Sequence, residues 1–261
     1  WLRGYSACLQ SIPCADSLLG LIMSHVIAKN VVVEFPVYAG KSLSFKSTLI
    51  RAATGGRMAR DASDRVVIRA VDNLSFELRE GDRVGIVGHN GSGKSTLLRT
   101  IAGAYEPVSG SMEVSGRFAT MLSIWLGMDL EATGYENIFL RATVMGLRRA
   151  EIEPLADEIC AFSELGDYLH MPLRTYSSGM AMRLAFATST GFPADIILMD
   201  EWMSVGDTDF SQKAQDRLRK MIDQAKILVL ASHDDALVKK NCNRIMRLDH
   251  GKMVELTERC N

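Results

Sequence analysis

Residues 88–95 read Gly-His-Asn-Gly-Ser-Gly-Lys-Ser and match the pattern GxxxxGK[ST]. The apolar run at 83–88 predicts a buried strand before this stretch, and residues 94–104 predict a helix after it. Strand, loop and helix in this order are typical of a phosphate-binding loop, because the glycines let backbone N–H groups converge on phosphate oxygens at the positive end of the helix. A glycine-rich turn without a ligand is the alternative, but the flanking strand and helix favour the functional interpretation.

The loop pattern predicts roles for individual residues. Lys94 is expected to reach the β- and γ-phosphates of a nucleotide, and the Ser95 hydroxyl is expected to ligate Mg²⁺. The residues of this stretch that are expected to contact the nucleotide are Gly88, His89, Asn90, Gly91, Ser92, Gly93, Lys94, Ser95 and Thr96.

The composition is that of an ordinary globular protein. Hydrophobic residues make up 47% and charged residues 23% of the 261 residues, which is enough chain for one domain with a full core. Lys and Arg number 30 against 31 Asp and Glu, so no overall basic field attracts nucleic acid and we expect no such partner. The five cysteines are scattered without metal-ligand or disulfide spacing, which favours a reducing, cytosolic setting.

The first 22 residues are expected to be a non-native or disordered extension. The apolar stretch at 18–28 is interrupted by Ser24 and His25 and is too short to cross a bilayer, and no clear signal peptide is present. Strand-like sequence begins only after Met23, so we expect the natural start there and one domain over residues 23–261.

The remaining pattern predicts a parallel α/β core with a helical lobe inserted midway, at approximately residues 125–190. Strands are expected at 31–36, 66–78, 83–88, 111–114, 195–200 and 226–232, with a terminal hairpin of 244–249 and 253–256. Helices are expected at 94–104, 134–163 and 178–191.

Residues 40–65 form a basic insertion between the first two predicted strands. A solvated charged face is the simpler interpretation of its lysines and arginines. Contact with a membrane partner or with anionic lipid headgroups is the alternative.

Acidic and imidazole side chains follow two of the predicted buried strands. Asp200 ends one strand and is followed at once by Glu201, and His233 comes just after the strand at 226–232. Because the carboxyl ends of parallel strands meet at one edge of a sheet, we expect these residues to lie near the phosphate-binding loop. Asp200 would then hold Mg²⁺, Glu201 would polarise an attacking water, and His233 would hydrogen-bond the γ-phosphate.

These features, together with Tyr176-Ser177-Ser178-Gly179-Met180 ahead of Asp200, resemble the ATP-binding cassette family from Val31 to Leu256. The resemblance implies a P-loop NTPase fold with a parallel α/β core, an antiparallel β subdomain and an inserted helical lobe. It implies ATP as the nucleotide, Mg²⁺ as the metal, and ATP hydrolysis by Glu201, His233 and Lys94. YSSGM stands where the family usually has LSGGQ.

The resemblance also implies a homodimer in which each ATP lies between the phosphate-binding loop of one chain and Ser177, Ser178 and Gly179 of the other. Asp207 is expected to couple the two sites, and Tyr38 is expected to stack on adenine, with Phe35 as the alternative. The family commonly places a glutamine near residue 124, where this chain has Met-Leu-Ser-Ile-Trp at 121–125.

The segment at 126–138, the opening VVVEFPVY and DEWMSVGD resemble the polysaccharide-exporter branch, and in particular its O-antigen (lipopolysaccharide) subgroup. The implied function is an ATPase that powers export of a lipid-linked polysaccharide, bound peripherally to permease subunits on the cytoplasmic face of the inner membrane. A teichoic acid or capsule exporter ATPase, a soluble non-transport ATPase and a non-hydrolysing ATP-gated scaffold are the alternatives.

Overall fold

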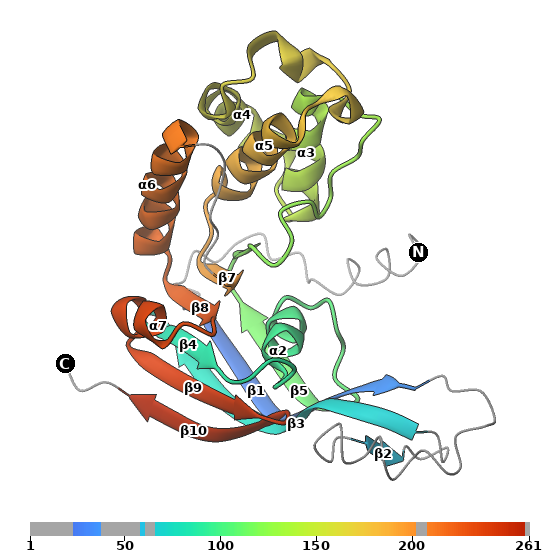
Figure 1. Ribbon diagram of the computed structural model, residues 1–261, viewed down its shortest axis with the longest axis vertical. Helices are drawn as coiled ribbons and strands as arrows, with labels where there is room; N and C mark the ends of the chain where they lie inside the picture. Colours follow the sequence, from blue (N-terminus) through green and yellow to red (C-terminus); the bar gives the residue numbers. More distant parts are fainter. Residues whose placement is uncertain (1–22, 38–57, 61–65, 202–207, 259–261) are drawn as a thin grey trace, which may run out of the picture.

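The computed structural model describes residues 23–37, 58–60, 66–201 and 208–258 (Figure 1). The expectations for residues 1–22, for Tyr38, for Asp207 and for most of the basic insertion lie outside these ranges.

A four-stranded sheet has the order β2-β3-β1-β5, and all its neighbours are antiparallel. Its strands are β1 (His25–Pro36), β2 (Met58–Arg60), β3 (Val66–Arg79) and β5 (Ser109–Ser115). This is the predicted antiparallel β subdomain. The grouping of 111–114 with the strands of the parallel core was wrong, because β5 pairs antiparallel with β1. β1 also begins six residues earlier than the predicted strand at Val31, at His25.

A six-stranded sheet has the order β10-β9-β4-β8-β7-β6. Its strands are β4 (Arg83–Val87), β6 (Phe118–Thr120), β7 (Ile196–Asp200), β8 (Ile227–Ala231), β9 (Arg244–Asp249) and β10 (Lys252–Glu258). Every pair is parallel except the hairpin of β9 and β10, as the sequence pattern predicted. The three-residue strand β6 was not predicted, because it is too short to show a period.

The helical lobe contains three α-helices and two short 3₁₀ helices. They are α3 (Gly134–Val144), α4 (Arg149–Ser163), η2 (Gly166–His170), η3 (Leu173–Thr175) and α5 (Ser178–Thr190). The single helical stretch predicted over 134–163 was wrong: it is two helices, separated at Gly146, whose φ of 83° suits glycine. Thr133 caps α3 in a reciprocal capping box with Glu136.

Three further helices of the described residues pack near the six-stranded sheet: α2 (Lys94–Ile101), α6 (Thr208–Gln224) and α7 (Asp235–Asn241). Helix α2 is shorter than the predicted 94–104, and α6 and α7 were not predicted. No described helix has both the length and the hydropathy needed to cross a bilayer.

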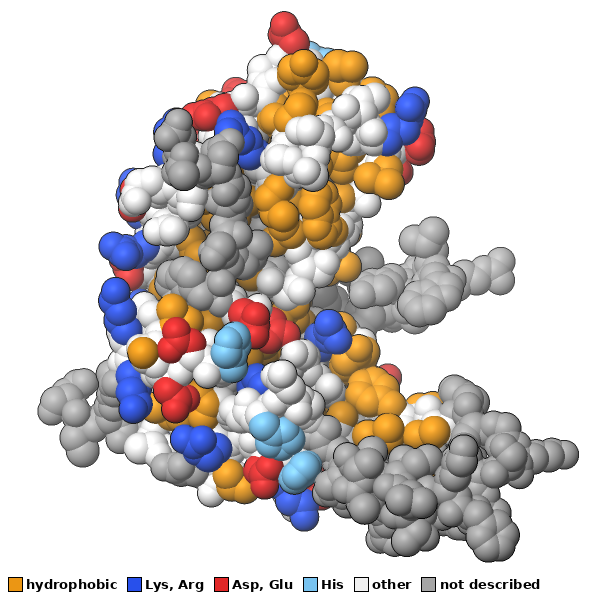
Figure 2. Space-filling view, viewed as in Figure 1, with side chains coloured by type: hydrophobic (Ala, Val, Ile, Leu, Met, Phe, Trp, Pro, Cys, Tyr) orange, Lys and Arg blue, Asp and Glu red, His pale blue; other side chains and the backbone are white. Residues whose placement is uncertain are grey.

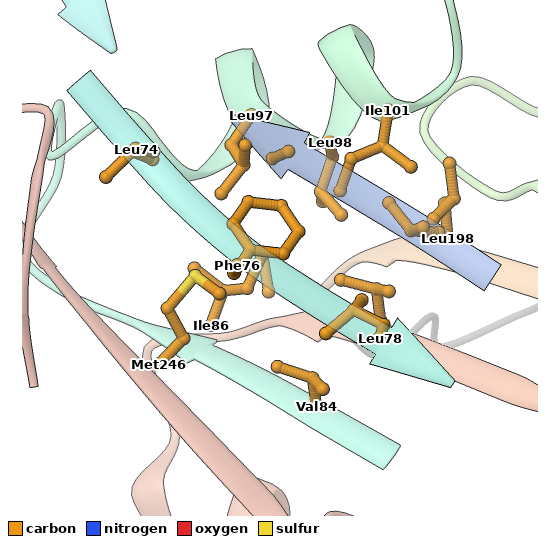
Figure 3. Packing of buried hydrophobic residues seen from close by; sticks show 14 of the residues in the cluster. Leu74, Phe76, Leu78, Val84, Ile86, Leu97, Leu98, Ile101, Leu198 and Met246 are labelled. Atoms are coloured by element: carbon orange, nitrogen blue, oxygen red, sulfur yellow. The ribbon is translucent and has the colours of Figure 1, made fainter. Parts of the chain in front are cut away.

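Helix α2 joins the two sheets through a common core (Figure 3). It packs against β3 and β5 of one sheet and against β7 and β8 of the other. Leu97 and Leu98 are fully buried there, beside Phe76 of β3 and Leu198 of β7. The helix that starts at Lys94 is therefore held by both sheets, which fixes the position of the phosphate-binding loop.

We expect Leu198→Ala to lower the free energy of unfolding by about 2–5 kcal/mol, because a fully buried leucine leaves a cavity that a packed core fills only in part. Urea denaturation followed by circular dichroism would measure it. Leu130→Ala is the matched control, because Leu130 is 59% exposed, and it should change stability by under about 0.5 kcal/mol. Equal losses in the two variants would contradict this account of the core.

Candidate active site

The phosphate-binding loop, the acid pair and His233 lie at one edge of the six-stranded sheet. Strand β8 pairs in parallel with both β4 and β7. The loop follows β4, Glu201 follows β7 and His233 follows β8. The structure therefore brings these three predicted groups together, as expected from the carboxyl ends of adjacent parallel strands.

The backbone of the loop depends on Gly93, which precedes α2. It has a φ of 111°, and a Cβ atom there would lie 2.5 Å from the carbonyl oxygen of Ala70. Lys94 folds back over the loop, and its Nζ donates to the carbonyls of Gly88 at 2.8 Å and His89 at 3.2 Å. The ammonium is thus held over the backbone of the loop.

The loop also contains a buried hydroxyl, that of Ser92, whose Oγ would lie 2.6 Å from a Cβ atom on Gly88. Ser92 is 1% exposed, and among the described residues its Oγ has no hydrogen-bond partner. A buried hydroxyl without a partner costs free energy, and a phosphate oxygen would satisfy it. The loop therefore fits a bound phosphate.

Ser95 and Asp200 come from elements that pack on each other. Ser95 lies in the first turn of α2, Asp200 ends β7, and both are half-buried. A hydroxyl and a carboxylate are oxygen ligands of the kind that Mg²⁺ prefers. The residues expected to hold the metal thus fit it chemically.

Glu201 and His233 form a side-chain pair. His233 Nδ1 lies 2.9 Å from Glu201 Oε1, and the two side chains are 71% and 63% exposed. Glu201 has a φ of 70°, a conformation that is rare outside glycine. Its backbone N–H donates to the Ala231 carbonyl of β8 at 2.8 Å. The strained backbone of Glu201 is thus tied to the strand that precedes His233.

The YSSGM segment does not lie with these groups. Ser177 caps α5 and accepts a hydrogen bond from the Met180 N–H at 3.2 Å, and Ser177, Ser178 and Gly179 are all exposed. Helix α5 belongs to the helical lobe, which has a hydrophobic core of its own. In Figure 1 its N-terminal end lies well away from α2. Within one chain, these residues are therefore separate from the phosphate-binding loop.

Arg141 contacts the segment that lacks the family glutamine, and the sequence reasoning missed it. It lies on α3, is 2% exposed, and its guanidinium donates to the carbonyls of Ile124, at 3.0 Å, and Leu126. Burial lowers its pKa to about 10. Ile138 lies three residues before Arg141 and Ala142 one residue after it, and both are fully buried. Helical periodicity could therefore have predicted that Arg141 faces inward.

Comparison with known proteins identifies the family. The model of the ABC transporter family matches residues 71–204. The chain is 47% identical over 233 residues to the O-antigen export system ATP-binding protein RfbE of Yersinia enterocolitica, covering 89% of this chain and 98% of the relative. This chain belongs to the ABC transporter family.

Other matches agree with this ABC transporter assignment. The teichoic acids export ATP-binding protein TagH of Bacillus anthracis is 40% identical over 186 residues, 71% of this chain and 34% of that protein. Among solved structures, a dimeric post-hydrolysis state of the ATP-binding cassette MJ0796 bound to ADP and phosphate has a TM-score of 0.61. It is 21% identical, and the match covers 89% of this chain and 98% of that chain.

The comparisons confirm the predicted fold class and the resemblance to the polysaccharide-exporter branch of ABC transporters. They also confirm, at the level of the family, that the chain is an ATPase domain. The roles of the individual site residues stay predictions.

We expect Gly93→Ala to lower the melting temperature, because the new Cβ would be strained at this φ and would clash with the Ala70 carbonyl. Gly103→Ala is the matched control. Gly103 also has a positive φ, of 72°, but a Cβ there meets nothing within 4 Å. The loss of stability in Gly103→Ala therefore measures the cost of backbone strain alone, without a steric clash. Differential scanning calorimetry would compare them, and an equal loss in both would show that the contact with Ala70 is unimportant.

Proposed function

We propose that this chain is the ATP-hydrolysing subunit of an ABC transporter that exports a lipid-linked polysaccharide of the O-antigen type. The observation that carries the proposal is the 47% identity to RfbE of Yersinia enterocolitica over 98% of that protein's length. Teichoic acid export is the second candidate, supported by the TagH relative, which is 40% identical and matches over 71% of this chain.

In the proposed reaction, Glu201 acts as the general base. Its carboxylate accepts a proton from a water whose oxygen attacks the γ-phosphorus, and the bond from that phosphorus to the β,γ-bridging oxygen breaks, giving ADP and phosphate. His233 Nδ1 holds Glu201 at 2.9 Å, which leaves Nε2 to face the γ-phosphate.

Lys94 and the backbone N–H groups of the loop would bind the β- and γ-phosphates. For this, Lys94 exchanges the carbonyls of Gly88 and His89 for phosphate oxygens. Ser95 and Asp200 would hold Mg²⁺, which supplies positive charge to the phosphate oxygens when bound.

The proposed active unit is a homodimer. Ser177, Ser178 and Gly179 are exposed at the N-terminal end of α5, where backbone N–H groups suit an anion. They are separate from the chain's own phosphate-binding loop, so a second copy would have to bring its own α5 to the nucleotide. The relative MJ0796 is described as dimeric with ADP and phosphate bound, which supports this arrangement.

The proposed membrane partner would dock on the helical lobe. Large hydrophobic side chains are exposed on and beside α3, and Figure 2 shows hydrophobic side chains gathered over the lobe. We call this the α3 surface; its residues are Trp125, Leu126, Leu130, Tyr135, Leu140 and Val144. An exposed apolar patch of this kind marks a protein or membrane contact. We propose that it binds the permease at the cytoplasmic face of the inner membrane.

Arg141 would connect this surface to the active site. It ties α3 to the carbonyls of Ile124 and Leu126, and Met121, at the start of this segment, donates its N–H to the Leu198 carbonyl of β7 at 2.8 Å. Asp200 and Glu201 follow at the end of the same strand. This chain of contacts offers a route between the permease and the acid pair without the family glutamine.

We expect Glu201→Gln to bind ATP but to hydrolyse it about 10²–10⁴-fold more slowly, because the amide keeps the shape of the side chain but cannot accept the proton from water. Phosphate release, nucleotide binding and light scattering would be measured together, and a dimer should accumulate with ATP. Glu164→Gln is the matched control, because Glu164 is in the helical lobe and pairs with Arg183 and Lys213. Turnover in Glu201→Gln equal to that of the unmodified chain would remove Glu201 from this role.

We expect Leu140→Glu/Val144→Glu to prevent co-purification with the co-expressed permease, because the two charges would be desolvated in an apolar contact. The two side chains are 41% and 56% exposed, so the fold should tolerate both changes, which a melting curve checks. Val108→Glu is the control, since Val108 is 60% exposed but lies just before β5. Retention of the permease by the double variant would exclude the α3 surface as its docking site.

A further inference from the structure

Two imidazoles and one carboxylate meet at the surface beside the phosphate-binding loop. His89 comes from the loop, Asp249 is the last residue of β9, and His250 lies in the turn between β9 and β10. His89 Nε2 lies 3.1 Å from Asp249 Oδ1, and His250 Nε2 lies 3.7 Å from the same oxygen. The possible ligand atoms all lie within 4.8 Å of one another. Figure 2 shows histidine side chains next to acidic ones on this face.

The hydrogen bond between His89 Nδ1 and the Asn90 carbonyl shows which nitrogen of the His89 ring carries the hydrogen and which one presents a lone pair to Asp249. Its Nδ1 lies 2.8 Å from the Asn90 carbonyl oxygen, which only accepts hydrogen bonds, so Nδ1 carries the hydrogen. In the neutral ring, Nε2 then directs a lone pair at Asp249 Oδ1. Two acceptors at 3.1 Å repel each other unless a proton or a metal ion lies between them.

The spacing of the three side chains suits a metal ion. Zinc binds imidazole nitrogen and carboxylate oxygen at about 2.0–2.2 Å in tetrahedral geometry, which separates neighbouring ligand atoms by about 3.4 Å. The observed separations of 3.1 and 3.7 Å lie on either side of this value. The hydrogen bond from His89 Nδ1 to a backbone carbonyl is also the second contact that metal-bound histidines commonly make.

The backbone holds the two segments together without help from these side chains. The Gly251 N–H donates to the Ser92 carbonyl at 2.8 Å, and the Asp72 N–H donates to the Gly251 carbonyl at 2.8 Å. Ligands that are already in place lose little entropy when an ion binds, which favours affinity.

We propose that His89, Asp249 and His250 bind a divalent transition-metal ion of the zinc class and that this ion ties the phosphate-binding loop to the β9–β10 turn. Three protein ligands leave one tetrahedral position for water. The two imidazole nitrogens distinguish this site from the oxygen ligands Ser95 and Asp200, which suit Mg²⁺. The site goes beyond the proposed export function and would link the binding of the metal to that of the nucleotide, because His89 belongs to the loop.

The test is titration of the full chain, freed of metal by a chelator, with Zn²⁺ alone in a calorimeter and with Co²⁺ in a spectrophotometer. We expect one strong site per chain and a Co²⁺ absorption band typical of tetrahedral coordination. His89→Ala, Asp249→Asn and His250→Ala should each weaken Zn²⁺ binding at least tenfold. His170→Ala, which removes another exposed histidine in the helical lobe, should leave binding unchanged.

Melting temperatures provide a second measurement that does not depend on ATPase activity. Zn²⁺ should raise the melting temperature of the unmodified chain by several degrees and that of Asp249→Asn much less, because an ion that binds only the folded state stabilises it. Melting in the chelator also shows whether each variant folds. Equal Zn²⁺ binding by the unmodified chain and a folded His89→Ala/His250→Ala variant would overturn the proposal. So would no binding at micromolar Zn²⁺, which would mean that a proton alone joins His89 and Asp249.

Discussion

The parallel pairing of β8 with both β4 and β7 is the constraint on which the candidate active site depends. It places the phosphate-binding loop, Glu201 and His233 at the ends of three adjacent strands. Helix α2 packs between this sheet and the antiparallel one, so the backbone of Lys94, its first residue, has a fixed position. The positive φ of Glu201 is then stabilised by a hydrogen bond to the neighbouring strand. The chemistry proposed for the site depends on this arrangement of residues at one edge of the sheet.

The helical lobe is a separate packing unit with a different role. Its core is formed mainly by side chains from α3, α4 and α5 and the two 3₁₀ helices. The buried guanidinium of Arg141 is costly to desolvate, as its lowered pKa of about 10 indicates. Its bonds to the Ile124 and Leu126 carbonyls therefore hold the lobe to the segment that leads from the core. A contact of this kind suits the proposed connection between the α3 surface and the active site.

The surface around the phosphate-binding loop combines two kinds of ligand chemistry. Oxygen groups lie where Mg²⁺ is expected, and the imidazoles of His89 and His250 lie together where the loop meets the β9–β10 hairpin. The Gly251 N–H bonds the loop directly at Ser92, so the terminal hairpin is part of the support of the site. The proposed zinc-class site would strengthen a contact that the backbone already makes.

The sequence by itself determined the phosphate-binding loop, the buried strands at 83–88, 195–200 and 226–232, and the family, because glycine spacing and continuous apolar runs are local signals. It also placed Glu201 and His233 after the correct strands. Only the tertiary structure decided that β5 joins the antiparallel sheet and that Arg141, His89, Asp249 and His250 have their present neighbours. The reason is physical: these features arise from contacts between residues far apart in the chain, and neither local propensity nor periodicity carries information about such contacts.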